Sequence, residues 1–230
     1  MKKTLLIVAV CFAFSCAKEE PNFTLKGNIK GLKKGTVYLE RVLDSTYEVI
    51  DSLTINGNSE FELHGNLKEP EVLLLRLNKN ANDEDLISFF ADEGITEITS
   101  TLKNFNFNAK IKGSKQQELL NEYSEMMAKF NNQNLDLIKE HFEPKKENDT
   151  TVVVDFETKQ NNLLRRKYLY TINFAVNHNT SEVAPYLAIS EIPDTNTKFL
   201  DTIYNTLKDS IKSTLYGKKL KELIDMRKQD

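Results

Sequence analysis

Residues 111–130 read IKGSKQQELLNEYSEMMAKF, and the hydrophobic period of the chain changes inside this stretch. Before Ser114, apolar and polar side chains alternate, as they do in half-buried strands. After Ser114, apolar residues recur three and four positions apart, which is the spacing of an amphipathic helix. Ser114 and Gln117 resemble a capping box, which marks a helix start. We therefore expect an α+β fold whose β half precedes its helical half.

The β half is expected over residues 23–112, where short alternating segments are separated by turn residues. Residues 72–75 form a continuous apolar run, which predicts a strand buried on both faces. The Asn56-Gly57 pair predicts a hairpin turn. Such spacing favours an antiparallel sandwich or barrel of about eight strands. The expected strands are 23–29, 36–41, 47–54, 59–64, 71–77, 86–91, 95–101 and 105–111.

The helical half is expected over residues 113–230. Two long helices are predicted at 114–141 and 152–177, because their apolar residues keep helical spacing. Pro144 and the polar residues after it predict a break between these two helices. Three shorter amphipathic helices are expected at 181–190, 197–208 and 216–227.

The segment before residue 23 has the features of an export signal. Lys2 and Lys3 precede an apolar run, Leu5–Ser15, that is too short to span a bilayer but fits a cleavable signal peptide. Cys16 ends a stretch that resembles a lipobox, although Ala13 stands where leucine is usual. We expect residues 1–15 to be a lipoprotein signal peptide, Cys16 to be lipidated, and residues 16–22 to form a tether. The alternative is an ordinary secretory signal with an incidental cysteine.

Lipidation of Cys16 would place the protein on a membrane. Stable attachment takes two or more acyl chains, of which palmitate is an example. The Lys18-Glu19-Glu20 stretch resembles the signal that exports lipoproteins to the cell surface in the Bacteroidota. We expect an outer-membrane, lipid-anchored protein at the cell surface or on the periplasmic face of that membrane.

Composition excludes several classes of function. The formal net charge is −3, and the basic residues are not gathered into one patch, so no nucleic-acid partner is expected. The two cysteines are Cys11, which leaves with the signal peptide, and Cys16, which is acylated. The mature chain would then have no disulfide, no thiolate metal site and no cysteine nucleophile.

Several short segments suggest a family. These are Phe23–Gly27, Asp51–Gly57 with Phe61 and Gly65 after it, and Tyr216–Leu220. Together they resemble a DUF4369-like domain of unknown function in Bacteroidota lipoproteins. The resemblance implies a β-then-α layout and a thioredoxin-like domain following it in thiol-disulfide oxidoreductases. This sequence has no Cys-x-x-Cys and ends where that domain would begin, so we expect no disulfide activity of its own.

No residue pattern indicates a catalytic centre, a cofactor or a metal. His64, His141 and His178 do not have metal-ligand spacing, and structural roles are expected for them. The polar residues of 78–85 have oxygen ligands at alternate positions, but a solvated loop is favoured over a Ca²⁺ site. A pair of carboxylates could serve a glycosidase, although the sequence does not locate one.

An Asp-Ser or Asp-Thr pair followed by an aliphatic residue or Thr occurs five times and resembles an acceptor motif for O-glycosylation. Ser45 and Thr150 are the favoured sites because both fall in expected loops. The alternative is structural, since these dipeptides also form turns and helix caps.

Three functions remain open. The leading hypothesis is an outer-membrane-anchored lipoprotein with a non-enzymatic binding or assembly role, whose partner is an envelope protein or a glycan. The second is an accessory module that acts with a thiol-disulfide oxidoreductase in the periplasm, and it rests on the resemblance alone. The third is a hydrolase of surface glycans or peptides that uses carboxylate catalysis.

Overall fold

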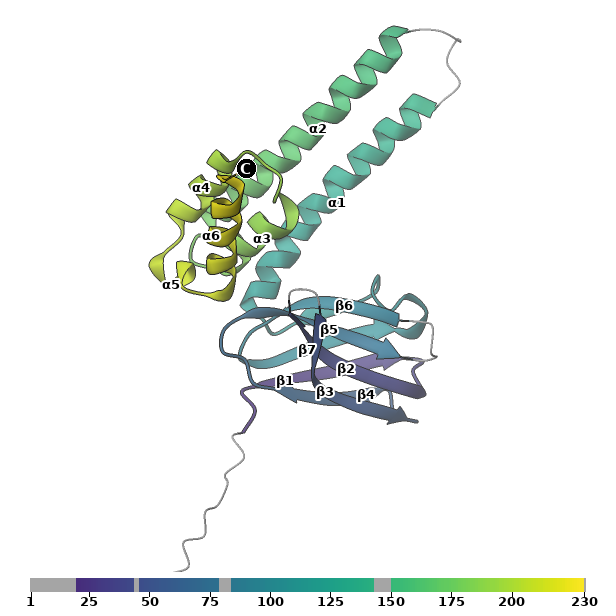
Figure 1. Cartoon of the computed structure of the whole chain (residues 1–230). Coiled ribbons are helices and arrows are strands. Elements are labelled where there is room, and N and C mark those ends of the chain that lie inside the picture. The colour runs from purple at the N-terminus through teal and green to yellow at the C-terminus, as the bar shows by residue number, and fades with distance from the viewer. Residues whose placement is uncertain (1–19, 44–45, 79–83, 143–149, 230) are drawn as a thin grey trace, which may run out of the picture.

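The computed structural model describes residues 20–43, 46–78, 84–142 and 150–229. Its first half is a sandwich of two four-stranded sheets, and its second half is helical (Figure 1). The expected α+β class is therefore confirmed. No helix among the described residues is both long and apolar enough to cross a membrane.

Sheet A has the strand order β4-β1-β7-β8, and sheet B has the order β3-β2-β5-β6. Inward side chains from both sheets form one closed apolar core that includes Phe23, Leu75 and Phe89. The core forms because each strand alternates apolar and polar residues, which sends one set to the same side of the sheet. The strands are β1 (Phe23–Lys30), β2 (Lys34–Leu43), β3 (Thr46–Asn56), β4 (Glu60–Gly65), β5 (Glu71–Asn78), β6 (Glu84–Ala91), β7 (Gly94–Thr101) and β8 (Lys110–Lys112).

Strand pairing differs from the expectation in two places. β1 and β7 pair in parallel, although the sheets are otherwise antiparallel. The turn at Asn56-Gly57 does not close a hairpin, because β3 pairs with β2 in sheet B whereas β4 pairs with β1 in sheet A. Gly57 does adopt the positive φ, 97°, that its turn signal indicates. The turn thus carries the chain from one sheet to the other.

The expected strand at 105–111 is wrong, since only Lys110–Lys112 form a strand there. The short 3₁₀ helix η1 (Leu102–Asn104) precedes Phe105, which is buried in the sandwich core. Asparagines alternate with aromatic residues in this stretch, and asparagine favours turns. Asn108 N donates to Asn104 O at 3.0 Å, so the alternation marks a turn rather than a strand.

The helical half contains two long antiparallel helices and a cluster of shorter ones. α1 (Lys115–Phe142) and α2 (Thr150–Asn177) each have 28 residues and extend away from the sandwich (Figure 1). At 1.5 Å per residue, each is about 42 Å long. The shorter helices are α3 (Val183–Glu191), α4 (Thr197–Thr206), α5 (Asp209–Lys212) and α6 (Leu215–Arg227), and they pack beside the near end of α2. The expected short helices are present, and α5 was not expected.

The helix start at Ser114 is confirmed, but the capping box is only half formed. Gln117 N donates to Ser114 Oγ at 3.1 Å, as an N-cap requires. The Gln117 side chain does not return to Ser114. Its Oε1 accepts from Phe90 N at 2.7 Å, so it joins α1 to the edge strand of sheet B.

Candidate functional site

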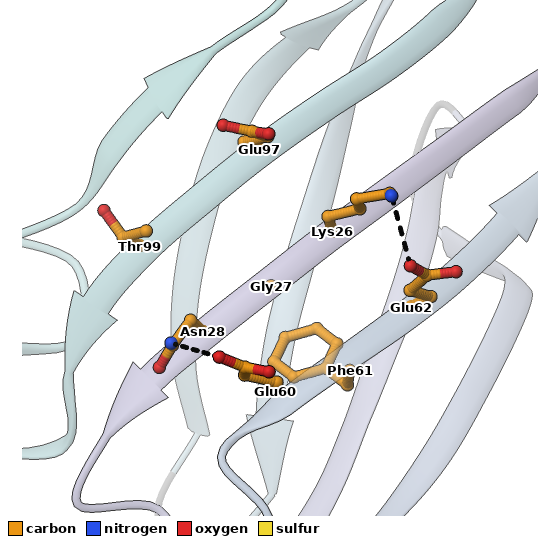
Figure 2. A pocket seen from close by; sticks show the side chains of 8 residues that line it. All are labelled: Lys26, Gly27, Asn28, Glu60, Phe61, Glu62, Glu97 and Thr99. Carbon is orange, nitrogen blue, oxygen red and sulfur yellow. Dashed lines mark hydrogen bonds and ion pairs between the residues drawn. The ribbon is translucent and has the colours of Figure 1, made fainter.

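The outer face of sheet A has a shallow hollow of about 460 Å³ (Figure 2). Its floor is formed where Phe61 of β4 packs against Gly27 of β1, and its rim is polar. Lys26 Nζ lies 3.4 Å from Glu62 Oε1, and Asn28 Nδ2 donates to Glu60 at 3.3 Å. These pairs follow from strand register, which places Lys26 opposite Glu62 and Asn28 opposite Glu60. One ion pair and one amide–carboxylate hydrogen bond therefore connect β1 and β4 on this face.

This face does not support acid–base catalysis. A glycosidase acid needs a carboxyl group whose pKa is raised by burial. Glu60, Glu62 and Glu97 are all exposed, and no exposed aromatic side chain lines the hollow. Exposed ion pairs of this kind contribute about 0–1 kcal/mol each. The arrangement fits a solvated sheet face, and the hydrolase hypothesis gains no support from it.

The junction between the sandwich and the helices is held by aromatic packing and by hydrogen bonds to the end of sheet B. The Phe90 ring lies edge-on to Tyr186 and Tyr216, with centroids 5.5 and 5.6 Å away. Tyr216 Oη accepts from Val72 N at 2.8 Å. Burial raises the pKa of Tyr216, so its hydroxyl stays protonated at neutral pH. A helical side chain thus accepts a hydrogen bond from a backbone N–H group at the end of a strand of sheet B.

Polar side chains are also buried at this junction. Glu182, at the start of α3, is 7% exposed and accepts from Gln116 Nε2 at 2.8 Å. Burial raises the pKa of Glu182, and the nearby Asp92 carboxylate adds to the effect. Asp92 Oδ2 accepts from Ser114 Oγ at 3.0 Å, whereas its buried Oδ1 has no hydrogen-bond partner. Among the described residues, no group of three or more potential ligands could hold a metal ion.

Two ion pairs, each between a buried glutamate and a partly buried arginine, join neighbouring strands of sheet B. Arg41 Nε donates to both carboxylate oxygens of Glu71, at 2.9 and 2.8 Å. Arg76 donates in the same bidentate way to Glu40, and its guanidinium stacks over Tyr38 at 4.1 Å. The hydrogen bond to Glu71 raises the pKa of Arg41. Such pairs fix strand orientation, because removing one partner would leave a buried charge.

A cleft of about 580 Å³ begins at the Arg41–Glu71 pair and extends to the first turn of α6. Its lining combines charged side chains, among them Lys68 and Glu69, with apolar ones such as Leu215. Glu69 Oε2 accepts from Leu215 N at 2.9 Å, so this carboxylate caps α6. The cleft therefore has a fixed wall on its helical side.

The other side of the cleft is the β2–β3 hairpin, which exposes an apolar patch. We call Val42, Leu43, Tyr47 and Val49 the hairpin patch. Tyr47 is 62% exposed and Val49 is 50% exposed. Register places Tyr47 opposite Val42, so these two side chains share one face of sheet B with Val49. Leu43, which pairs with Thr46, points to the other face and lines the cleft. Alternation in β2 and β3 predicts strands correctly, but it does not predict that this apolar face is left uncovered.

Hollows also lie along the arm formed by α1 and α2. One of about 310 Å³ is lined by Phe130, Leu163 and several amide side chains. Another, of about 350 Å³, is lined mainly by charged residues, including Glu140 and Lys159, whose side chains pair at 3.3 Å. The two hollows share Leu163, so they lie on either side of the same helix pair.

The residues predicted to be modified are mostly outside the described part of the chain. Cys16 and Ser45 are not described, so lipidation and glycosylation there stay predictions. Thr150 is the first residue of α2 rather than a loop residue, and its side chain is not described. The break expected at Pro144 and much of the 78–85 segment also lie outside the described residues.

The three histidines are on β4 (His64), near the end of α1 (His141) and just after α2 (His178). His64, on β4, has Nδ1 3.2 Å from Thr24 Oγ1. His141 is near the end of α1 and stacks on Phe156 with centroids 4.2 Å apart. His178 Nδ1 lies 2.8 Å from Phe174 O.

Asp51 has a role that its place in the sequence only partly predicts. Its Oδ1 accepts from Ser52 N at 2.8 Å, which is the expected local hydrogen bond. Its Oδ2 accepts from His64 N at 2.8 Å, so the carboxylate also joins β3 of sheet B to β4 of sheet A. This long-range contact closes one side of the sandwich.

Comparison with known proteins finds a match that covers the sandwich. No curated protein matches the chain. Residues 23–120 match the family described as Domain of unknown function (DUF4369). The match begins at the first residue of β1 and ends in the first turns of α1, so it covers the whole sandwich and the start of the arm. The resemblance to a DUF4369 domain is therefore confirmed over residues 23–120.

Proposed function

We propose that this protein is an outer-membrane-anchored envelope lipoprotein with a non-enzymatic binding or assembly role. It is tethered through Cys16 and binds an envelope protein at the hairpin patch. The observation that carries the proposal is the exposed cluster of Val42, Leu43, Tyr47 and Val49 beside a charged cleft.

The patch has the composition of a protein interface. Protein interfaces have an apolar or aromatic centre surrounded by a polar rim, and tyrosine is enriched among the residues that dominate binding. Tyr47 would be the central anchor, and Arg41 and Glu48, which pair at 2.7 Å, would form part of the rim. The patch also adjoins the sheet surface that the helices already cover at Val72 and Phe90. The helices cover only part of this apolar surface of sheet B. The part left exposed, the hairpin patch, favours a protein partner that would cover it.

The entry of the chain into the sandwich suits a tether. Asn22, just before β1, exchanges two side-chain hydrogen bonds with the Leu67 backbone, each 2.8 Å long. Its carbonyl accepts from Gly94 N at 2.8 Å. Extended chain between Cys16 and Asn22 spans at most about 20 Å, so an anchored sandwich would lie close to the bilayer. The arm points away from the end where the chain enters (Figure 1).

A photo-crosslinking amino acid at position 47 tests the binding role in cells. We expect a specific crosslinked adduct, because Tyr47 is the most exposed residue of the patch. The matched control is position 107, where Phe107 is an aromatic residue 89% exposed outside the patch. Equal labelling at both positions, or no adduct at position 47, would contradict the proposal.

Replacement of the anchor cysteine tests the location. Cys16→Ser should move the protein from the outer-membrane fraction to the soluble envelope fraction and should abolish labelling by a palmitate analogue. Protease treatment of intact cells would then distinguish the cell surface from the periplasmic face. Membrane fractionation that is unchanged by Cys16→Ser would exclude a lipid anchor at this position.

A second candidate, in which the partner is a thiol-disulfide oxidoreductase and this protein is its accessory, rests on the resemblance described in the sequence analysis. The same crosslinking experiment decides between the candidates, because the adduct can be identified by mass spectrometry. An adduct with a thioredoxin-like protein, together with an altered thiol state of envelope proteins in a deletion strain, would support the accessory role. An adduct with another envelope protein and an unchanged thiol state would reject it.

A further inference from the structure

The arm has a polar seam that the proposed protein-binding role does not use. In α1 the least exposed residues recur at alternating intervals of four and three, which is the spacing of a coiled-coil seam. They are Tyr123, Met127, Phe130, Asn134, Leu137 and His141. The same intervals in α2 select Phe156, Gln160, Leu163, Lys167, Tyr170 and Phe174.

Ring contacts fix how the two helices are aligned. At the far end His141 stacks on Phe156 at 4.2 Å, and at the near end Tyr123 lies 5.4 Å from Phe174. This antiparallel alignment assigns three polar residues to successive layers, each opposite an apolar one; Asn134 and Lys167 are half-buried, and Gln160 is exposed at the edge of its layer. The pairs are Phe130 with Lys167, Asn134 with Leu163, and Leu137 with Gln160.

Polar residues at seam positions leave space that an apolar residue would fill. They are costly in a coiled coil and are kept where they specify an alignment or serve a function. Here the result is a hollow of about 310 Å³, which is at the lower end of the range for small-molecule sites. Phe130 and Leu163, each 7% exposed, form its apolar floor.

Four amide side chains line this hollow, and none forms a hydrogen bond to another described residue. They belong to Asn131, Asn134, Gln160 and Asn161. Each amide offers both donors and an acceptor. No carboxylate lines the hollow, and the ammonium of Lys167 lies 3.8 Å from Glu191. The lining is therefore neutral in balance and rich in free hydrogen-bonding groups.

The opposite face of the same arm provides an internal comparison. The hollow there is lined by two amides, Gln133 and Asn162, together with four charged side chains, those of Asp136, Glu140, Lys159 and Arg166. The amide-lined hollow has four amides and a single charged side chain, Lys167. Its lining is therefore the less charged of the two, which favours a ligand that is itself uncharged.

We infer that the amide-lined hollow of the arm binds a neutral saccharide. A sugar has hydroxyl groups that both donate and accept hydrogen bonds, and it has an apolar C–H face. The four amides match the first feature, and the Phe130–Leu163 floor matches the second. This site is separate from the hairpin patch, so it stands independently of the protein-binding role proposed above.

Binding can be measured on the whole lipoprotein, purified in a detergent that has no sugar head group. The probes are maltose, cellobiose and N,N′-diacetylchitobiose as neutral disaccharides, with a glucuronate disaccharide as the acidic comparison. Saturation-transfer NMR should show contact with at least one neutral disaccharide and weaker contact with the acidic one. The absence of contact with all three neutral probes at millimolar concentration would overturn the proposal.

Paired variants locate the site. Asn134→Ala with Gln160→Ala should weaken saccharide binding at least tenfold while leaving the helical circular dichroism unchanged, since alanine favours helices. The matched control is Gln133→Ala with Asn162→Ala, which removes two amides from the opposite face.

Equal losses of saccharide binding in both pairs of variants would overturn the assignment. So would a change of oligomeric state in the first pair without any saccharide signal, because the hollow would then be a contact between copies. Crosslinking at position 47 should be unchanged in every variant, which separates this test from that of the hairpin patch.

Discussion

The sandwich and the outer part of the arm bury their apolar residues to very different degrees. The sandwich core contains 18 buried apolar residues, most of them from the strands of both sheets. In the arm beyond Phe130, the seam alternates apolar residues with Asn134, Gln160 and Lys167, and hollows open on both faces. This difference indicates that burial in the sandwich provides most of the free energy of unfolding. Surface residues of the outer arm can therefore be changed with little effect on global stability.

Truncation of a core aromatic residue tests this difference most strongly. Phe89→Ala should lower the free energy of unfolding by about 3–5 kcal/mol, because Phe89 is fully buried between the sheets. Leu137→Ala in the arm should cost about 1 kcal/mol or less, since Leu137 is only half-buried. Denaturant unfolding of both variants measures the contrast. Similar losses would show that the arm is as important for stability as the sandwich.

Gly27→Ala sharpens the account of how tightly the sandwich is packed. A Cβ at this position would lie 2.0 Å from Phe61 Cζ, so the ring must move. We expect Gly27→Ala to lower the free energy of unfolding by about 1–3 kcal/mol. Phe61→Leu in the same chain should restore part of that stability.

Gly57→Ala is the matched control for this prediction. A Cβ there would meet nothing within 4 Å, and only the positive φ is unfavourable. Gly57→Ala should lower the free energy of unfolding by about 1 kcal/mol, whether or not Phe61 is replaced. If Phe61→Leu does not restore stability in the Gly27→Ala variant, the close contact with the Phe61 ring is not the reason that position 27 requires glycine.

Filling the seam should make the arm more like the sandwich. Asn134→Leu should slow amide hydrogen exchange in the outer turns of α1 by an amount equivalent to about 0.5–2 kcal/mol of local opening. Global unfolding of the sandwich should not change. Asn162→Leu, on the charged face, is the control and should leave exchange unaltered. Faster exchange in Asn134→Leu would show that the polar seam residue stabilises the arm.

The smallest expected effect concerns the junction between the two regions. The folded-state pKa of Glu182 is raised by burial, so the folded protein binds its proton more tightly than the unfolded chain does. This contribution to stability is complete below the unfolded pKa of about 4.3. It is lost as pH rises through the folded pKa.

Glu182→Gln should therefore stabilise the protein at neutral pH and flatten this part of the pH profile. The glutamine carbonyl can still accept from Gln116 Nε2. Thermal unfolding from pH 4 to pH 8 measures the effect. A variant that is less stable than the parent at neutral pH would show that the ionised carboxylate is needed at the junction.

Much of the architecture was predictable because periodicity is a local property. The alternation in Phe23–Lys30 and the helical spacing after Ser114 identify strand and helix from neighbouring residues alone. The same local rule failed at Phe105–Asn108, where alternation reflects an asparagine-rich turn around one buried ring. The start of α1 was predictable from Ser114, whereas the partner of the Gln117 side chain was not.

The candidate sites were less predictable than the fold. Tyr47 and Val49 have the alternation of any half-buried strand, and their exposure depends on which face of sheet B the helices cover. The polar seam at Asn134 and Gln160 is visible as an interruption in the spacing of α1 and α2. Whether these polar residues line a common hollow depends on how α1 and α2 are aligned. That alignment is set by contacts between two separate segments of the chain.

The sequence by itself determined the order of strands and helices, the change of period at residue 114 and the position of a candidate anchor at Cys16, because each is encoded by adjacent residues. Only the tertiary structure decided that β1 lies parallel to β7, that Asn56-Gly57 joins two sheets, and that the hairpin patch stays uncovered. These outcomes depend on contacts between residues far apart in the chain. The free energies of such contacts compete over the whole molecule, so no local pattern specifies them.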